Sequence, residues 1–302
     1  MQSVYAIIVS YNGLKWYDRC LGSLQQSEVP LTTIVVDNAS TDESCNYIRQ
    51  HFSEVILFPQ DKNLGFGQAN NLGIRYALDH GADYVFLLNQ DAWIEPDTIK
   101  NLIEIHQKHP EYGILSSIHI TADKHHIEPL LLQRLCDYHT TDSALLNDLY
   151  LGNLKDIYDT KYVNAAAWLL PRKTLETVGG FDPIFFHYGE DDNYINRVLY
   201  HGMKIGICPK ERIVHDMRLD RPLYDTREHE ILTLIDYTNP NTQHDIDCDI
   251  HSHRVKAMRS LLRGRKEAFD AHMADYRLLR KYRDAIIKSL ATNRQKGLSW
   301  IS

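Results

Sequence analysis

Four short apolar runs near the start of the chain constrain its fold more than any other feature. They are rich in β-branched and aromatic side chains, which is typical of strands buried on both faces of a sheet. The runs are residues 4–9, 33–36, 55–58 and 84–88, and segments with apolar residues at helical spacing lie between them, around 14–27, 42–51 and 66–80. This alternation predicts an α/β fold with a Rossmann-like, mostly parallel central sheet flanked by helices.

Polar clusters follow three of the predicted strands, at 10–12, 37–42 and 89–91. Ligands of open parallel sheets bind outside the carboxyl ends of the strands, so we expect these loops to line one crevice. The middle cluster, DNASTD, suits contacts with a nucleotide's base and ribose, although Ser40 or Thr41 could also cap a helix. The candidate binding residues of the three loops are Ser10, Tyr11, Asn12, Asp37, Asn38, Ser40, Asn89 and Gln90.

The predicted strand at 84–88 ends abruptly in Asn89, Gln90 and Asp91. A carboxylate at the end of a buried strand is costly to desolvate unless a partner compensates. A divalent cation, Mg²⁺ or Mn²⁺, that bridges the phosphates of a sugar nucleotide is such a partner, because these ions take one or two protein carboxylates together with phosphate oxygens. The alternative is that Asp91 caps the helix after Pro96 or begins a turn.

Three consecutive acids, Glu190, Asp191 and Asp192, open a helix predicted over 190–202. Acids are common in a first helical turn because they complement the helix dipole. An approach rich in aromatic residues and glycine, at 185–189, would also place one carboxylate beside an apolar wall. Such burial raises the pKa of a carboxyl group and suits it to accept a proton from a hydroxyl.

The segment 62–73, KNLGFGQANNLG, departs from the dinucleotide fingerprint GxGxxG. Asn70 stands where the third glycine belongs, and the string lies in the third strand–helix unit instead of the first, which argues against NAD. We expect its glycines to let the backbone approach a nucleotide's base or ribose. The candidate residues here are Asn63, Gly65, Gly67 and Asn70.

Beyond residue 118 the periodicity weakens, and we interpret 119–160 as a variable lobe on the acceptor side. Regularity returns with a strand candidate over 162–172, the turn GGFD at 179–182 and a short strand at 204–208. We expect the acceptor side to be lined by Trp168, Gly180, Phe181 and Asp182, because the apolar face of a sugar stacks well on an aromatic ring. Core packing is the alternative for Trp168.

His215 follows the last predicted strand and precedes Asp216, as a further ligand of the same cation would. A lone histidine is more often a structural or surface residue. Other histidines lie in polar stretches without a ligand spacing, and we interpret them as solvated loop residues; they include His125, His126, His244, His251 and His253.

Charge is unevenly distributed along the chain. Residues 251–302 hold 13 Lys and Arg against 4 Asp and Glu, a net charge of +9, so the overall -7 leaves -16 for residues 1–250. Apolar residues recur among the basic ones from 253 to 290, which predicts two amphipathic helices broken near Gly264. Such a tail could dock on an anionic membrane or form a homo-oligomer, whereas the acidic body argues against nucleic acid as a partner.

The sequence contains no run of the roughly 20 apolar residues that a membrane-spanning helix needs, and its first residues enter a strand without the pattern of a signal peptide. Five scattered cysteines without a CxxC pair are typical of reduced, structural residues. These features predict a cytoplasmic protein, with peripheral association at the inner face of the membrane through the tail.

Seven motifs, taken in order, carry a resemblance to a known family. They are SYN (10–12), VDNAS (36–40), NLGFGQANNLG (63–73), LLNQDA (87–92), GGFD (179–182), EDDNYINR (190–197) and VHD (214–216). Over about residues 4–220 the chain resembles the family 2 inverting glycosyltransferases of GT-A fold. Within that family it is similar to the rhamnosyltransferase-like enzymes of bacterial cell-surface polysaccharide synthesis, in which NxD replaces DxD.

The resemblance implies a GT-A domain over 1–220, with a nucleotide-sugar half to about residue 118 and an acceptor and catalytic half beyond it. A linker and the basic amphipathic helical tail would follow over 221–302. The resemblance further implies that Asp37 and the loop 63–67 hold the nucleotide, that Asp91 and His215 bind the metal, and that Asp191 is the general base.

Two residues depart from the family's acidic pattern, Asn89 and Asn193. Asn89 offers the cation a carbonyl oxygen but no charge. Asn193 makes Asp191 a better candidate for the base than Glu190 or Asp192.

The implied reaction is the metal-dependent transfer of a hexosyl or deoxyhexosyl group from a UDP- or dTDP-sugar to a hydroxyl of a glycan or lipid-linked acceptor. Two alternatives remain open. One is a non-catalytic sugar- or nucleotide-binding module on a GT-A scaffold, which the two asparagines allow. The other is a nucleotidyltransferase, although residues 10–15 are only a faint version of the phosphate loop that it needs.

Overall fold

The computed structural model describes residues 2–217 and 227–301. The chain divides into two compact units, one of residues 1–221 with 296–302 and one of residues 222–295. The domain boundary predicted at 220 and the start of the predicted linker lie outside the described residues. The segment 296–302 belongs to the first unit, so the tail predicted over 221–302 is not one continuous appendage.

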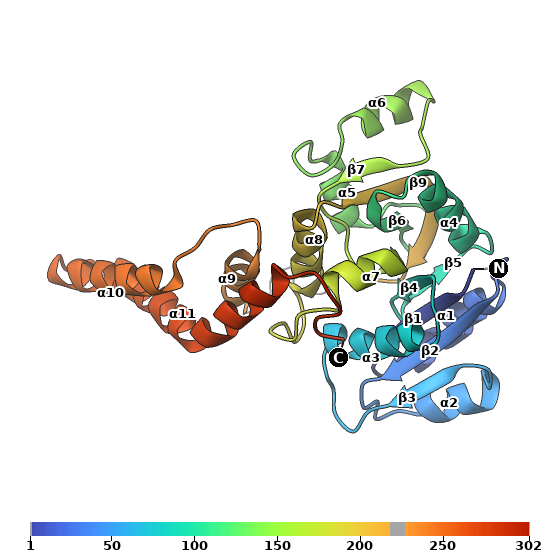
Figure 1. Ribbon diagram of the computed structural model, residues 1–302, viewed down its shortest axis with the longest axis horizontal. Coiled ribbons are helices and arrows are strands. Elements are labelled where there is room, and N and C mark those ends of the chain that lie inside the picture. The colour runs from blue at the N-terminus through green and yellow to red at the C-terminus, as the bar shows by residue number, and fades with distance from the viewer. Residues whose placement is uncertain (1, 218–226, 302) are drawn as a thin grey trace. The chain divides into compact units, whose positions relative to one another are not determined.

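The first unit begins with the predicted parallel half-sheet. Its strands are β1 (Val4–Ser10), β2 (Leu31–Asp37), β3 (Ile56–Pro59) and β4 (Tyr84–Leu88), in the spatial order β3-β2-β1-β4 and all parallel. The connecting helices are α1 (Tyr17–Gln25), which a short 3₁₀ turn precedes, α2 (Ser44–His51) and α3 (Phe66–Asp79) (Figure 1). Each element lies within a few residues of its expected position.

The second half of the sheet is mixed. Its strands are β5 (Ala92–Ile94), β6 (Tyr112–Ile120), β7 (Tyr158–Thr160), β8 (Ala167–Pro171) and β9 (Lys204–His215). The order continues from β4 through β8, β6 and β9 to β5, and β7 also pairs with β9. Because β8 runs antiparallel to both β4 and β6, the sheet is parallel only in part. The last strand extends seven residues beyond the predicted end at Cys208, to His215.

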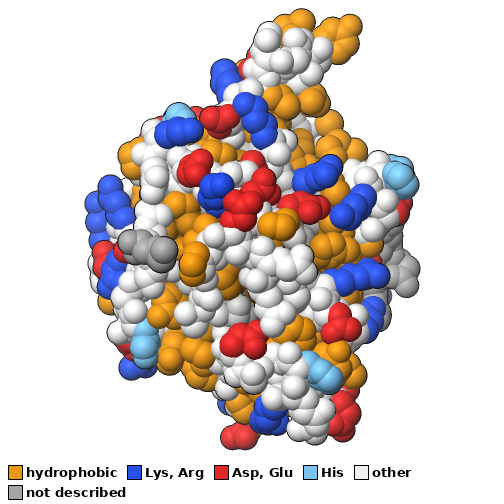
Figure 2. Space-filling model, turned by 90° about the vertical axis from the view of Figure 1, so that its right-hand side faces the viewer, with side chains coloured by type: hydrophobic (Ala, Val, Ile, Leu, Met, Phe, Trp, Pro, Cys, Tyr) orange, Lys and Arg blue, Asp and Glu red, His pale blue; other side chains and the backbone are white. Residues whose placement is uncertain are grey.

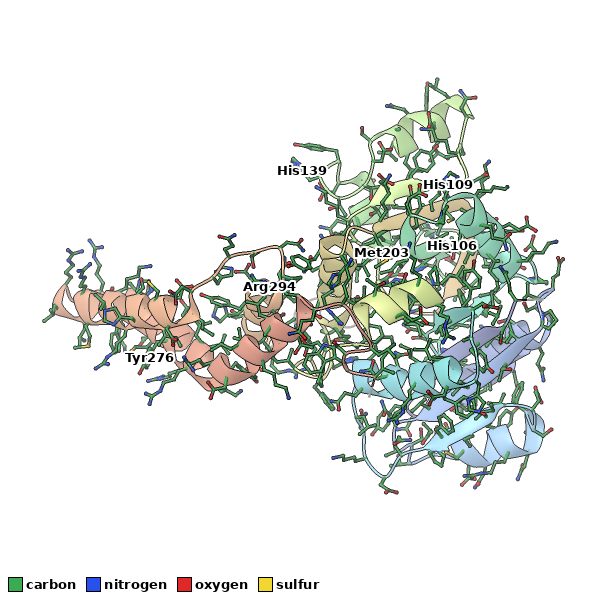
Figure 3. All side chains as sticks on the ribbon, in the orientation of Figure 1. His106, His109, His139, Met203, Tyr276 and Arg294 are labelled. Carbon is green, nitrogen blue, oxygen red and sulfur yellow. The ribbon has the colours of Figure 1, made fainter. Side chains whose placement is uncertain are left out.

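Helices cover both faces of this sheet. The additional helices of the unit are α4 (Thr98–Lys108), α5 (Pro129–Cys136), α6 (Ala144–Leu151), α7 (Arg172–Val178) and α8 (Glu190–Tyr200). Alternate residues of β1 face opposite layers: Ile7 packs in the core beneath α3, α7 and α8, whereas Ala6 and Ile8 pack in the core beneath α1, α2 and α4. Polar contacts add to the packing, since the Tyr84 hydroxyl lies 2.8 Å from Nδ1 of His106 on α4 (Figure 3).

Side chains of α8 hold the GGFD turn (179–182) in place. On α8, Arg197 donates to the Gly180 carbonyl at 2.6 Å and to the Val178 carbonyl, and the Tyr194 hydroxyl donates to the Gly179 carbonyl at 3.1 Å. Arg197 is 1% exposed, so these backbone carbonyls replace water around a buried guanidinium.

Two further segments meet the same turn. Asn71 of α3 donates to the Phe181 carbonyl at 2.8 Å and accepts from the Phe181 amide at 2.7 Å. The Gly180 amide donates to the Ser299 carbonyl at 2.8 Å. Gly179 has φ +80° and lies so close to Ser299 that a side chain there would collide with its backbone. The segment 296–301 therefore completes the first unit.

This arrangement corrects the expected acceptor lining. Trp168 and Phe181 are 0% exposed and stack on each other with ring centroids 6.2 Å apart, and Asp182 is 1% exposed. Gly180 is buried against Asn71 and the returning chain. These four residues therefore offer almost no surface to an acceptor sugar, and for Trp168 core packing, the alternative to stacking, is the right one.

The lobe between β6 and β8 carries exposed apolar side chains. Leu146, Leu149, Tyr150 and Leu151 of α6 are all exposed, whereas Leu145 is buried. Figure 2 shows hydrophobic side chains at the upper tip of the molecule, where α6 lies, and interspersed acidic and basic side chains on the face below it.

The second unit consists of helices. They are α9 (Glu228–Thr238), α10 (Ile246–Leu262) and α11 (Lys266–Asn293), with Gly264 at φ +67° between the last two, as predicted. The end of α11 is held to the end of α9 and the following turn: Asn293 donates to the Thr238 carbonyl at 3.2 Å and Arg294 to the Thr242 carbonyl at 3.1 Å (Figure 3). No helix within the described residues is long and apolar enough to span a membrane.

Replacement of Arg197 by Met should destabilise the first unit by about 3 kcal/mol, because two buried carbonyls lose charged donors and the turn loses its anchor. Urea unfolding followed by tryptophan fluorescence measures this, since Trp16, Trp93, Trp168 and Trp300 all belong to that unit. The matched Arg75→Met substitution on the exposed face of α3 should stay within about 0.5 kcal/mol of the parent. Equal effects of the two substitutions would contradict the anchoring role.

Candidate active site

The loops after β1 and β4 are joined by one side chain. Gln90 Oε1 accepts from the Ser10 hydroxyl at 2.8 Å and from the Tyr11 amide at 3.0 Å, and Gln90 Nε2 donates to the Tyr11 carbonyl at 3.2 Å. Because β1 and β4 are parallel neighbours, their carboxyl ends lie at the same edge of the sheet. The structure thus brings together the residues predicted at these two strand ends.

The loop after β2 joins them through its own polar network. Ser40 Oγ accepts from the Asn12 amide at 2.8 Å, and Asn12 Oδ1 accepts from the Thr41 amide at 2.8 Å. Asp37, which is 2% exposed, accepts from the Ser40 amide at 2.9 Å and from its hydroxyl at 2.5 Å. Since α2 begins only at Ser44, Ser40 and Thr41 do not cap it, and that alternative is wrong.

Asn38, in the loop after β2, connects that loop to the segment 63–65 before α3. Its Nδ2 donates to the Gly65 carbonyl at 3.1 Å, and its Oδ1 accepts from the Leu64 amide at 3.1 Å. Asn63 Oδ1 in turn accepts from the Gly65 amide at 2.8 Å. The loops around 10–12, 37–41, 63–65 and 89–91 therefore form one connected rim.

The glycines of 62–73 serve packing instead of ligand approach. Gly65, at φ +81°, contacts the backbone of Phe186, and a Cβ on Gly67 would lie 2.8 Å from Cβ of Phe181. Asn70 is 1% exposed and donates to the Phe66 carbonyl at 3.1 Å within α3. The expectation that Gly67 and Asn70 contact the nucleotide is thus wrong, because the start of α3 lies against the chain at 181–186.

Asp91 and His215 meet through strand pairing. β5 is antiparallel to the end of β9, in the register Ala92 opposite His215, and the Asp216 amide donates to the Asp91 carbonyl at 2.8 Å. This register places His215 Nε2 3.4 Å from Asp91 Oδ1. Asn89 Nδ2 also lies 3.4 Å from His215 Nε2. The predicted pair is therefore assembled from positions far apart in the sequence.

Two residues that the sequence did not single out, Glu128 and His119, lie close to the Nδ1 side of the His215 ring. Glu128, 1% exposed, lies 3.1 Å from Nδ1 of His215 and 3.3 Å from Nδ1 of His119, and Asn164 Nδ2 donates to both of its oxygens. Burial alone would raise the pKa of Glu128, but the interactions with His119 and His215 outweigh it and hold that pKa below its usual range. No local spacing signals this cluster, because the chain turns back after β6 to bring Glu128 beside His119.

The residues at this point fit a divalent cation. Burial alone would lower the pKa of His215, but Asp91 and Glu128 outweigh it and raise the pKa to about 9. Nδ1 faces Glu128, which leaves Nε2 towards Asp91, as in the carboxylate–histidine–metal arrangement of known sites. The 3.4 Å between Nε2 and the Asp91 oxygen suits two ligands of one ion, and a cation would displace the proton of the ring.

The three acids at the start of α8 are held with raised pKa values. Burial, then the charge of Asp191, raises the pKa of Glu190 to about 8, and the same two causes raise the pKa of Asp192 to about 7. Burial also raises the pKa of Asp191. Desolvation and the crowding of three carboxyl groups therefore make these side chains more basic than free carboxylates.

Asp191 is the best oriented of the three. Its Oδ2 accepts from the Tyr162 hydroxyl at 3.2 Å and its Oδ1 from the Asp192 amide at 2.9 Å, while the side chain stays only half-buried. Glu190 is 4% exposed and packs behind it, with Cβ 3.7 Å from the Cβ position of Gly67. The approach to the helix includes Tyr188 at φ +70°, a strained value for a residue that is not glycine.

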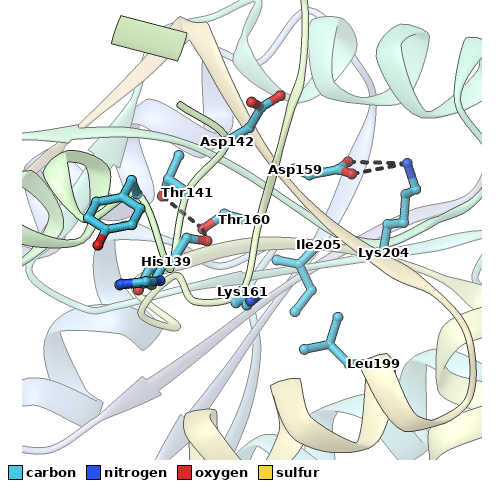
Figure 4. A pocket seen from close by; sticks show the side chains of 11 residues that line it. His139, Thr141, Asp142, Asp159, Thr160, Lys161, Leu199, Lys204 and Ile205 are labelled. Atoms are coloured by element: carbon cyan, nitrogen blue, oxygen red, sulfur yellow. Dashed lines mark hydrogen bonds and ion pairs between the residues drawn. The ribbon is translucent and has the colours of Figure 1, made fainter. Parts of the chain in front are cut away.

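A pocket of about 460 Å³ lies elsewhere in the first unit, between the loop 138–142, β7 and the start of β9 (Figure 4). It contains none of the predicted site residues. Its Lys204 is paired with Asp159 at 3.1 Å, and Thr141 bonds to Thr160 across it (Figure 4). Strand ends and loops, not this pocket, define the candidate active site.

Comparison with known proteins identifies a family and several relatives. The model of the family "Glycosyl transferase family 2" matches residues 5–173. The dTDP-rhamnosyl transferase RfbF of Shigella flexneri is 25% identical over 214 residues, which is 70% of this chain and 69% of that protein. The N-acetylglucosaminyl-diphospho-decaprenol L-rhamnosyltransferase of Mycobacterium tuberculosis is 26% identical over 232 residues, 69% of this chain and 74% of that protein.

Solved structures share the fold. TarS of S. aureus, in complex with UDP-GlcNAc, superposes with a TM-score of 0.59 at 13% identity, over 97% of this chain and 90% of that one. GalNAc-T7 with UDP, GalNAc and Mn²⁺ superposes with a TM-score of 0.57 at 15% identity, over 80% of this chain and 52% of that one. At these identities the likeness shows the fold alone.

Proposed function

The chain belongs to glycosyl transferase family 2, and we propose that it transfers a deoxyhexose from a dTDP-sugar to a hydroxyl of a lipid-linked or glycan acceptor, with inversion. The observation that carries the proposal is that one unit contains the connected rim of strand-end loops, the Asp91–His215 pair and the partly exposed Asp191. Deoxyhexose is favoured over hexose, and dTDP over UDP, because the Shigella relative is a dTDP-rhamnosyl transferase and the mycobacterial one an L-rhamnosyltransferase. The corresponding biological role of this chain is polysaccharide synthesis in bacteria.

At the donor end, the loops joined by Gln90, Ser40 and Asn38 present backbone and side-chain polar groups to the nucleotide. Asp37 supports this rim from beneath, since its carboxylate is bonded to Ser40. Asp91 and the Nε2 of His215 would hold Mn²⁺ or Mg²⁺, which supplies Lewis-acid stabilisation of the leaving diphosphate. Asn89 contributes an amide and no charge, so the protein provides a single carboxylate here.

At the acceptor end, Asp191 accepts the proton of the acceptor hydroxyl as the hydroxyl oxygen forms its bond to the anomeric carbon. The bond from that carbon to the diphosphate oxygen breaks, and its electron pair leaves with the nucleoside diphosphate. The hydrogen bond from Tyr162 orients the carboxylate and stabilises its charged form. One base and one displacement invert the anomeric configuration.

Two exposed aromatic rings replace Trp168 and Phe181 as candidates for acceptor stacking. Phe186 is 51% exposed and lies against Gly65 of the donor rim, and Tyr188 is 44% exposed and precedes the acids by two residues. Both rings therefore belong to the approach that connects the two ends of the site.

The second unit offers a surface suited to a membrane where a lipid-linked acceptor resides. Around the turn between α10 and α11, Met258, Leu261 and Leu262 are exposed at 51%, 52% and 84%. The basic side chains beside them, Arg259, Arg263, Arg265 and Lys266, are exposed and make no ion pair with another described residue. Apolar and cationic groups together favour anionic interfaces. Peripheral membrane attachment on the cytoplasmic side is thus part of the proposal.

Replacement of Asp191 by Asn should lower kcat by about 10²–10⁴-fold with little change in the KM for the donor, because the base acts in the transition state and not in donor binding. Transfer of radiolabelled sugar measures this. The matched Asp192→Asn variant should lose less than about tenfold. Near-normal turnover by Asp191→Asn, or a greater loss in Asp192→Asn, would reject Asp191 as the base.

A dTDP-sugar should raise the Tm of the full-length protein, and Mn²⁺ should raise it further, since a ligand that binds only the native state stabilises it. His215→Ala should abolish the Mn²⁺-dependent part while leaving the metal-independent shift. His109→Ala, at a partly exposed histidine outside the site, serves as control and should behave as the parent. An unchanged Mn²⁺ response in His215→Ala would remove this residue from the cation site.

Substitution of Arg259, Arg263, Arg265 and Lys266 by Gln should lower binding to phosphatidylglycerol vesicles by about a hundredfold or more, because each basic residue contributes roughly 1 kcal/mol near an anionic surface. Co-sedimentation measures the partition. A protein with Lys100, Lys155, Lys204 and Lys210 changed to Gln carries the same change in charge on ion-paired residues of the first unit and should bind as the parent. Equal losses would mean that net charge alone drives binding.

A further inference from the structure

A cluster of histidines and an aspartate lies in the second unit, remote in sequence from the candidate active site. His272 and Asp275 are three residues apart on α11 and share one face of that helix. His253 reaches them from α10, and His229 from α9. The expectation that His251 and His253 are solvated loop residues is wrong, since both lie within α10. Three helices therefore converge on one carboxylate.

The distances within the cluster are those of groups around a common point. His253 Nδ1 lies 3.2 Å from Asp275 Oδ2, and one ligand atom from each of His253, His272 and Asp275 lies within 4.8 Å of the others. The two imidazole rings have centroids 5.7 Å apart and an interplanar angle of 61°. Nε2 of His229 bonds to the other oxygen of Asp275 at 2.8 Å.

Two ring nitrogens of this cluster have no hydrogen-bond partner among the described residues. Nδ1 of His253 and Nδ1 of His272 are both buried, and neither makes a hydrogen bond with another described residue. Buried polar atoms without partners are rare in proteins and mark sites where an ion or another group is missing. His253 Nδ1 is close to the Asp275 carboxylate but is not aligned to donate to it.

We propose that His253, His272 and Asp275 bind a Zn²⁺ ion that links α10 to α11, with His229 holding the carboxylate in place. Two imidazoles and one carboxylate are a common ligand set for Zn²⁺, with water in the fourth position. Ligand atoms bound at about 2.0–2.2 Å to a tetrahedral ion lie roughly 3.3–3.6 Å apart. The 3.2 Å between His253 and Asp275 is close to this range, so rotation of side chains suffices to complete the site.

The helical unit gains from such a link. Among its described residues the buried apolar side chains are few: Leu234, Ile246, Ala257, Leu279 and Ile286. A unit of this size with so small a core is marginally stable, and a bound metal contributes its binding free energy to folding. His253 lies between Ile246 and Ala257 on α10, and His272 lies between the turn at Gly264 and Leu279 on α11. The ion would therefore add a link between the two helices beside these few apolar contacts.

The test uses the full-length protein with Asp91→Ala and His215→Ala, which removes the other cation site. After treatment with a chelator and dialysis against buffered Zn²⁺, elemental analysis should find one equivalent of zinc. Co²⁺ in its place should give the intense visible absorption of a tetrahedral complex. His272→Ala and, separately, Asp275→Asn should weaken zinc binding at least about tenfold.

The matched control is His251→Ala, an exposed histidine two residues before His253 on the same helix. It should bind zinc as the parent does. Far-ultraviolet circular dichroism shows whether each variant is folded. If His272→Ala does not fold, the zinc affinity of Asp275→Asn, whose side chain has the same shape as that of the parent, tests the proposal. Failure to bind stoichiometric zinc, or equal binding by Asp275→Asn and the parent, would overturn the proposal and leave an ordinary histidine–aspartate ion pair.

Discussion

The pairing of β5 with the end of β9 is the constraint on which the candidate active site depends. Three residue pairs, from Ala92 opposite His215 to Ile94 opposite Ile213, join segments more than a hundred positions apart. A slip of one residue would turn His215 to the other face of the sheet and separate it from Asp91. The same strand end lies beside β6, so His119 and the returning Glu128 reach the opposite side of the ring. One short antiparallel ladder thus assembles both the cation ligands and their support.

The parts of the fold set by local pattern could be predicted. Apolar runs gave β1 to β4, and helical spacing gave the helices between them, because both signals reside in contiguous residues. Asp91, Asp37 and the loops after β1 and β2 followed from the rule that ligands bind beyond the carboxyl ends of parallel strands. Glu128, His119 and the zinc ligands could not be found this way. Their proximity arises from turns and helix packing that no spacing within one segment encodes.

Small and aromatic residues were the other source of error. Gly65, Gly67 and Gly180 were expected to face a ligand, but each lies against another part of the protein. A missing side chain signals close approach without identifying what approaches. From the sequence, Trp168 was equally consistent with stacking on a sugar and with packing in the core. Only its complete burial in the structure distinguishes the two roles. Sequence therefore identified the segments around the site better than the atoms that face it.

Because residues 296–302 belong to the first unit, the C-terminal helices lie between two segments of that unit in the sequence. Ser299 bonds to Gly180, and Ile301 lies against the same turn that Arg197 and Asn71 hold. A protein shortened to remove the helices would also uncover this turn, and its loss of activity would reveal nothing about the helices. Internal excision that keeps 296–301 is the operation that separates the two roles.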